Sequence, residues 1–127
     1  MKDIIVTTPK HNMELAAQEA AECLIAGGGY YFRTFRTKPL ELGIGSKIFY
    51  VEDGYVRGYG VVSEIVNGTM KCVTSSKDWG YGGHAFMPTE CWTWIHPIAM
   101  KGFQGYRYFD SRNVVSIGTW RDPKPKV

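Results

Sequence analysis

The segment from Leu24 to Ile65 constrains the fold of this chain more than any other part of the sequence. It contains the end of a run with helical periodicity, then three consecutive glycines, and then segments rich in aromatic and β-branched residues. Such a change of period over a short distance predicts a helix that leads directly into a β-sheet.

The predicted helix extends from Met13 to Ile25. Apolar residues recur there at three- and four-residue intervals, and polar residues occupy the opposite face, which is typical of an amphipathic helix. Thr8 followed by Pro9 fits an N-cap and a first helical position, and Asn12 fits the cap of a shorter helix. The glycines that follow the run fit its C-terminal end.

Strand patterns account for most of the remaining chain. Asp53-Gly54 predicts a two-residue hairpin, and Asn67-Gly68 predicts a second one. The glycine-rich sequence between Ser75 and Phe86 predicts an irregular loop. We expect about six strands, drawn from Ile4–Val6, Tyr30–Phe35, Lys47–Val51, Tyr55–Val66, Thr69–Thr74, Cys91–His96 and Val114–Trp120. One main helix with these strands predicts an α+β fold.

The composition fits one domain. The 127 residues are 44% hydrophobic, which is enough for a single core, and no linker or repeat divides them. We therefore expect one domain over residues 1–120. Residues 121–127 are basic and proline-spaced, and we expect them to form a mobile tail.

Several classes of protein are disfavoured. No apolar run approaches the roughly twenty residues that a membrane-spanning helix needs, so we expect a soluble, cytoplasmic protein with no membrane partner. The three cysteines are widely spaced and predict reduced thiols rather than a disulfide framework. Histidine and cysteine spacings match neither a metal site nor a catalytic dyad, and nothing predicts a cofactor.

The charge distribution suggests a partner. The net charge is only +3, but residues 29–50 carry four basic side chains against one acidic, and residues 99–127 carry six against two. Basic residues interleaved with aromatic residues suit phosphate neutralisation and base stacking, so RNA or DNA is the expected partner. Arg33, Arg36 and Lys38 are the first candidates. A solvated strand face explains them equally well.

The order of these elements resembles the ASCH and EVE branches of the PUA-like superfamily. The resemblance lies in a helix that runs into glycines, an Arg-bearing strand, and the hairpin formed by Gly45–Tyr50 and Val56–Gly58. It covers about a third of the chain. It implies a small β-barrel of five to six mostly antiparallel strands, flanked by the N-terminal helix, with a cleft between the helix end and the barrel.

The resemblance also implies functions. Most PUA-like domains bind RNA, EVE domains resemble readers of modified bases, and some ASCH proteins are amidohydrolases that act on modified nucleosides. When Gly29 and Arg36 are aligned with the family's glycine and arginine, the expected catalytic Lys and Thr fall on Tyr31 and Phe32. No catalytic residue is therefore carried over. An enzyme would need a re-sited catalytic set.

A second segment rich in basic and aromatic residues, Lys101 to Tyr108, is similar to the aromatic strand motif of RRM domains. An RRM needs two helices and only one is predicted, so the fold is rejected, but the chemistry still suits bases. Lys101, Phe103 and Arg107 are candidates, with Phe103 equally explained as core. Strand alternation places Tyr106 and Tyr108 on one face and Arg107 on the other.

The remaining candidates surround the glycine-rich segment. Trp92 and Trp94 share a strand face and suit the wall of a base pocket, although core packing explains them as well. Trp79 lies between polar and glycine residues and is the best single stacking candidate. His84 lies beside glycines and suits a phosphate or base contact, with an ordinary loop histidine as the alternative.

These observations predict a domain that binds nucleic acid or a modified base or nucleotide. One alternative is an ASCH-type amidohydrolase that uses Glu64 or Lys38. The other is a protein-interaction domain whose aromatic surface is an interface. The choice between RNA and DNA, and the oligomeric state, are left open.

Overall fold

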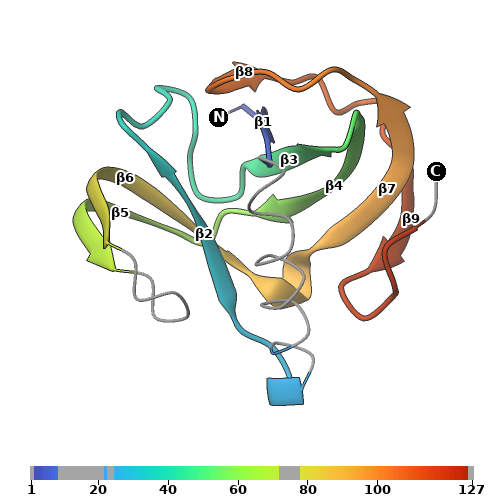
Figure 1. The fold of residues 1–127 in the computed structure, drawn as a ribbon, viewed down its shortest axis with the longest axis horizontal. Helices are drawn as coiled ribbons and strands as arrows, with labels where there is room; N and C mark the ends of the chain where they lie inside the picture. The colour runs from blue at the N-terminus through green and yellow to red at the C-terminus, as the bar shows by residue number, and fades with distance from the viewer. Residues whose placement is uncertain (1, 9–21, 23–24, 72–77, 126–127) are drawn as a thin grey trace.

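The chain folds into two β-sheets (Figure 1). The computed structural model describes residues 2–8, 22, 25–71 and 78–125. Within these residues the strands are β1 (Ile4–Thr7), β2 (Tyr30–Phe35), β3 (Lys47–Glu52), β4 (Tyr55–Val61), β5 (Glu64–Lys71), β6 (Asp78–Pro88), β7 (Thr93–Ala99), β8 (Tyr106–Tyr108) and β9 (Ser116–Thr119), with one 3-10 turn, η1 (Thr89–Cys91).

The larger sheet has the strand order β8-β1-β3-β4-β7-β9, and the smaller sheet has the order β2-β6-β5. The β1–β3 pair is parallel, and the other described pairs are antiparallel. Neither sheet closes on itself. Strands β8 and β9 are therefore the two edges of the larger sheet, and β2 and β5 are the edges of the smaller one.

The prediction of an α+β fold with a small closed barrel and a main flanking helix is wrong. The described residues are almost entirely β, and their strands belong to two separate, unclosed sheets. The break follows β4: Val62 still bonds to Gly45 and Ser46 beside β3, whereas the Ser63 N–H donates to the carbonyl of Phe86 on β6, and β5 begins at Glu64. The predicted helix, residues 13–25, lies outside the described residues apart from Glu22 and Ile25, whose backbone is helical.

The hairpin at Asp53-Gly54 is confirmed. Strands β3 and β4 are joined there by a two-residue loop, with Glu52 paired to Tyr55. Asp53 and Gly54 have φ values of 51° and 84°. Two successive positive φ values define the type I′ turn, whose twist matches that of the strands it joins.

The second hairpin and the irregular loop are wrong. Strand β5 runs straight through Asn67-Gly68, and the glycine-rich segment forms β6, the central strand of the smaller sheet. The glycines of β6 serve close packing rather than turning. A Cβ atom on Gly82 would lie 2.3 Å from the carbonyl oxygen of Phe35, so only glycine fits this approach between strands.

The core is divided by β3 into two clusters. Ile48 and Tyr50 face the smaller sheet and pack with residues of β2 and β6, which joins the two sheets. Phe49 and Val51 face the other side, where they are covered by partly buried residues of the 100–114 segment. This alternation is the ordinary two-sided burial of a central strand. The covering segment carries β8 to the edge of the larger sheet (Figure 1).

Candidate nucleic-acid interface

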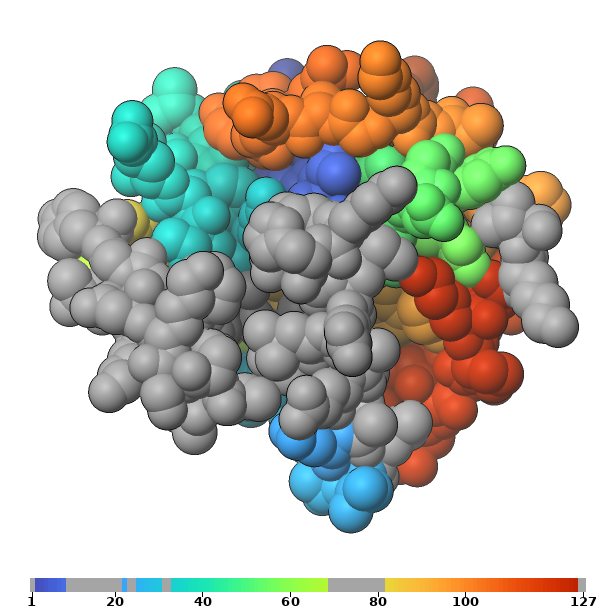
Figure 2. Space-filling view, viewed as in Figure 1, coloured from blue at the N-terminus to red at the C-terminus, as the bar shows by residue number. Residues whose placement is uncertain are grey.

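Strand β8 is a short, exposed edge strand. It pairs with β1 alone, in the register Ile4 with Tyr108 and Val6 with Tyr106. All three of its residues are exposed. In the space-filling view, the segment that contains β8 forms a ridge along the top of the molecule (Figure 2). The side chains of β8 therefore lie on the surface, while its backbone is held by pairing with the buried strand β1.

The segment before β8 is fixed against the end of β1. The backbone N–H of Phe103 donates to Thr7 Oγ1 at 3.0 Å. Gly102 lies against the same side chain, because a Cβ atom there would be 3.0 Å from Thr7 Cγ2. Gly105 then takes a positive φ of 76° at the turn into β8. These contacts set the direction in which β8 leaves the loop.

Tyr106 and Tyr108 form an exposed aromatic pair. Their ring centroids are 5.8 Å apart at an interplanar angle of 81°, and the residues are 37% and 43% exposed. The Phe35 ring meets Tyr106 edge-on at 6.0 Å, and the backbone N–H of Glu41 donates to the Tyr108 hydroxyl. Phe35 on β2 and Glu41 in the loop after β2 therefore hold the two rings, while part of each ring remains exposed to solvent.

The Tyr106 hydroxyl carries no negative charge at neutral pH. Desolvation, and then the neighbouring Tyr108, raise the pKa of Tyr106 above its ordinary value. A phenol with a raised pKa stays protonated through the physiological range. Tyr106 therefore presents a neutral ring that does not repel a polyanion.

Positive charge surrounds the pair. The Lys2 ammonium lies 5.4 Å from the centroid of the Tyr108 ring and pairs with Glu41. On the other face of β8, the Arg107 guanidinium lies 4.2 Å from the centroid of Phe103. Two further exposed cations lie near β8 or its contacts along the chain. Lys101 precedes it in the loop, and Arg36 follows Phe35, which contacts Tyr106.

We call this region the β8 surface. Its members share an exposed position on or beside β8 and are Tyr106, Tyr108, Lys2, Arg36, Lys101 and Arg107. Sequence reasoning named Arg36, Lys101 and Arg107, and it placed the tyrosines on one face. It missed Lys2, because nothing in the local sequence shows that β1 pairs with β8.

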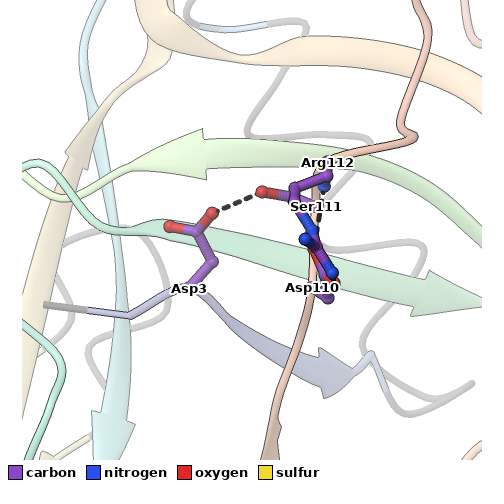
Figure 3. A network of polar contacts seen from close by, with 4 residues as sticks. All are labelled: Asp3, Asp110, Ser111 and Arg112. Carbon is purple, nitrogen blue, oxygen red and sulfur yellow. Dashed lines mark hydrogen bonds and ion pairs between the residues drawn. The ribbon is translucent and has the colours of Figure 1, made fainter.

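Just after β8, a polar network joins Asp3 to Ser111 and Asp110 to Arg112 (Figure 3). Asp3 accepts hydrogen bonds from Ser111 Oγ at 2.7 Å and from the Lys47 N–H at 2.8 Å. Asp110 pairs with Arg112 at 2.6 Å, and the hydrogen bonds from Arg112 hold the pKa of Asp110 below its usual range. Lys2 and Asp3 line a shallow, open depression here with residues 108–111. The carboxylates near the β8 surface are thus engaged by neighbours.

The other cationic candidates are engaged in structural contacts. Arg33 Nη1 donates to the carbonyl of Thr7 at 3.3 Å, which ties β2 to the end of β1. Lys38 Nζ donates to the carbonyl of Leu42 at 2.7 Å and so closes the loop after β2. Lys38 is also one of the two residues offered for a re-sited catalytic set, and this contact holds its ammonium within the loop. The other, Glu64, is an exposed residue of β5.

His84 is a buried link within the smaller sheet. It is 0% exposed. Its Nδ1 lies 2.8 Å from Thr34 Oγ1 on β2, and its Nε2 lies 2.8 Å from the Gly68 carbonyl oxygen on β5. The ring therefore bridges both neighbours of β6, which leaves it no exposed surface for a ligand.

Replacing this histidine should affect stability rather than binding. We expect His84→Ala to lower the free energy of unfolding by about 1–3 kcal/mol, because it leaves a partly buried hydroxyl and a partly buried carbonyl without this partner. Urea denaturation measures this loss. Thr34→Val removes one of the two links and should cost less. A His84→Ala protein as stable as the wild type would contradict the structural role.

The tryptophan candidates lie away from the β8 surface. Trp92 and Trp94 do adjoin each other, with ring centroids 5.2 Å apart. They lie at β7, which the sheet order places toward the opposite edge from β8. Trp92 packs against Tyr50 and over Gly58, where a Cβ atom would lie 2.5 Å from its ring. Trp79 lies on β6 rather than in a loop, and its side chain is outside the described residues.

Two features are absent from the described part of the chain. No helix there has the length and apolar character required to cross a bilayer. No group of three or more His, Cys, Asp or Glu side chains converges there in a way that suits a metal ion.

Comparison of the chain with protein-family models, with curated proteins and with solved structures gave no match.

Proposed function

We propose that this protein binds single-stranded nucleic acid through the β8 surface. The observation that carries the proposal is the pair Tyr106 and Tyr108, two supported and partly open rings on an exposed edge strand. Exposed aromatic rings held on a rigid strand are the usual platform for unpaired bases.

The geometry of the pair supports stacking. The rings meet edge to face at 81°, so they do not cover each other's faces. Phe35 and the Glu41 N–H hold them from one side. A base that stacks on either ring therefore gains contact with little loss of side-chain freedom.

The surrounding charges support phosphate contact. Lys2, Arg36, Lys101 and Arg107 are all exposed. Arg107 lies across the strand from the tyrosines, where its guanidinium rests on Phe103. A phosphate next to a base stacked on Tyr108 would thus meet Lys2, whereas Arg107 would be reached where the nucleic-acid strand crosses to the other face of β8. A duplex, whose bases are already stacked, would gain only the charge contacts.

The modified-base, amidohydrolase and protein-interface readings stay predictions from the sequence. The first requires the Trp92 and Trp94 pair, which lies away from the β8 surface. The second uses Glu64, an exposed residue of β5, or Lys38, whose ammonium donates to backbone carbonyls. No contact among the described residues favours the modified-base reading or the amidohydrolase reading over nucleic-acid binding at the β8 surface.

The salt dependence of binding tests the proposal. We expect the logarithm of the association constant for a short single-stranded oligonucleotide to fall linearly with the logarithm of salt concentration, with a slope of about −2 to −3 for three to four phosphate contacts. Fluorescence anisotropy of labelled RNA and DNA oligonucleotides measures this slope. The substitution Arg107→Gln should make the slope shallower by about 0.7.

Arg121→Gln is the matched control, because this arginine is also exposed but rests on the Trp120 ring, just after β9 at the opposite edge of the larger sheet. It should leave the slope unchanged. Saturable binding whose association constant does not change with salt concentration, or no binding to either RNA or DNA, would contradict the proposal.

A further inference from the structure

A buried arginine on β4 is unrelated to the β8 surface. Arg57 is only 8% exposed. It lies at a break in the strand pairing, because Tyr50 pairs with Gly58 and Val51 pairs with Val56, which leaves Arg57 without a partner on β3. The pairing of β4 with β7 shifts at the same place. Arg57 is thus the extra residue of a β-bulge, a feature that redirects a side chain out of the regular alternation.

The guanidinium of Arg57 is only partly satisfied. Its Nη2 donates to the carbonyl of Pro125. Its Nε is buried and has no hydrogen-bond acceptor among the described residues. Nε and Nη2 lie on the same edge of the planar guanidinium and donate in parallel. A single carbonyl oxygen matches one of these donors, whereas a carboxylate or phosphate offers two oxygens at the spacing of the fork.

No described carboxylate balances this charge. Glu52, on the adjacent strand β3, pairs with Lys124. Asp122 accepts from the N–H and hydroxyl of Thr119. A buried charge without an anionic partner costs free energy, and an anion bound beside Arg57 would offset this cost.

Residues 121–125, which we call the C-terminal strap, cover this arginine. Three contacts hold the strap, each to a different strand. Trp94 Nε1 donates to the Asp122 carbonyl at 3.2 Å, Lys124 pairs with Glu52, and Arg57 donates to Pro125. Apart from the ion pair, these contacts use backbone carbonyls, which an incoming anion outcompetes for a guanidinium.

We propose that Arg57 is the base of a binding site for an oxyanion group, a carboxylate or a phosphate, which the C-terminal strap covers. In the structure, the Pro125 carbonyl oxygen takes the place of one oxygen of that group. Binding of the anion displaces Pro125 and loosens the Lys124–Glu52 ion pair and the Trp94 contact. Binding at Arg57 and release of the strap are therefore one coupled event.

The test uses the full chain and two probes, inorganic phosphate and acetate, each titrated at constant ionic strength against chloride. The readout is the indole N–H signal of Trp94 in ¹⁵N NMR, assigned with Trp94→Phe. We expect a saturable shift of this signal. A response to phosphate alone assigns a phosphate ligand, a response to acetate alone assigns a carboxylate, and a response to both assigns the shared oxyanion chemistry.

Two variants sharpen the result. Lys124→Met removes the ion pair of the strap and should tighten anion binding severalfold. Arg57→Lys keeps the charge but loses the two-donor fork, and should weaken binding by about tenfold or more. Arg57→Met, whose apolar side chain suits a buried site, should abolish the response while the protein remains folded. Arg112→Lys, an exposed arginine, should change nothing.

The proposal is overturned by either of two results. One is the absence of a saturable Trp94 shift with both anions in the wild type and in Lys124→Met. The other is an affinity in Arg57→Lys equal to that of the wild type.

Discussion

Phe49→Ala is expected to lower the free energy of unfolding by about 3–5 kcal/mol, the range for removing a large buried aromatic side chain. Phe49 is 0% exposed and lies on β3, between β1 and β4. Its ring centroid lies 5.1 Å from that of Tyr59 and 4.7 Å from that of Phe109. A central strand bonded on both sides cannot collapse around the lost ring, so most of the cavity should remain. Urea denaturation followed by circular dichroism measures the loss.

Ile44→Ala is the matched control, because this apolar residue is 67% exposed. It should change the free energy of unfolding by less than about 0.5 kcal/mol. Phe49 also supports Phe109, which lies in the segment that carries β8. A loss below about 1 kcal/mol in Phe49→Ala would contradict the division of the core into two clusters by β3.

The double substitution Tyr106→Ala/Tyr108→Ala is expected to weaken the binding of single-stranded nucleic acid by at least about tenfold. Each stacked base contributes about 1–3 kcal/mol, and every 1.4 kcal/mol is about a tenfold change in affinity. The two rings touch each other, so their effects should couple rather than add in full. Because both residues are exposed, the fold should persist.

Local sequence signals predicted the local parts of the fold. Strand β2 has the predicted bounds, Tyr30–Phe35, because its aromatic and β-favouring residues are bounded by glycines and polar residues. The Asp53-Gly54 turn follows from two residues that tolerate positive φ. The same rule failed at Asn67-Gly68, where β5 continues. Glycine permits a turn but does not require one, and in this sheet it permits close packing instead.

These local signals could not predict which distant segments of the chain pair with each other. The same strand patterns can form either one barrel or two sheets. What distinguishes them is the point after β4 where the chain passes from the larger sheet to the smaller one. The alternation in β8 did predict that Tyr106 and Tyr108 share a face, and this is confirmed. Their exposure depends on β8 pairing with β1 at the sheet edge. The burial of His84 likewise depends on Thr34 and Gly68 from two other strands.

The most direct test of the β8 surface compares three proteins by fluorescence anisotropy with the same labelled single-stranded oligonucleotide at one salt concentration. They are the wild type, Tyr106→Ala/Tyr108→Ala and Tyr30→Ala. Tyr30 is a matched control because it is 69% exposed and begins β2, at the end of the molecule away from β8 (Figure 1). We predict wild-type affinity for Tyr30→Ala and a loss of at least about tenfold for the double variant. Equal affinity in all three proteins would contradict the assignment of the nucleic-acid site to β8.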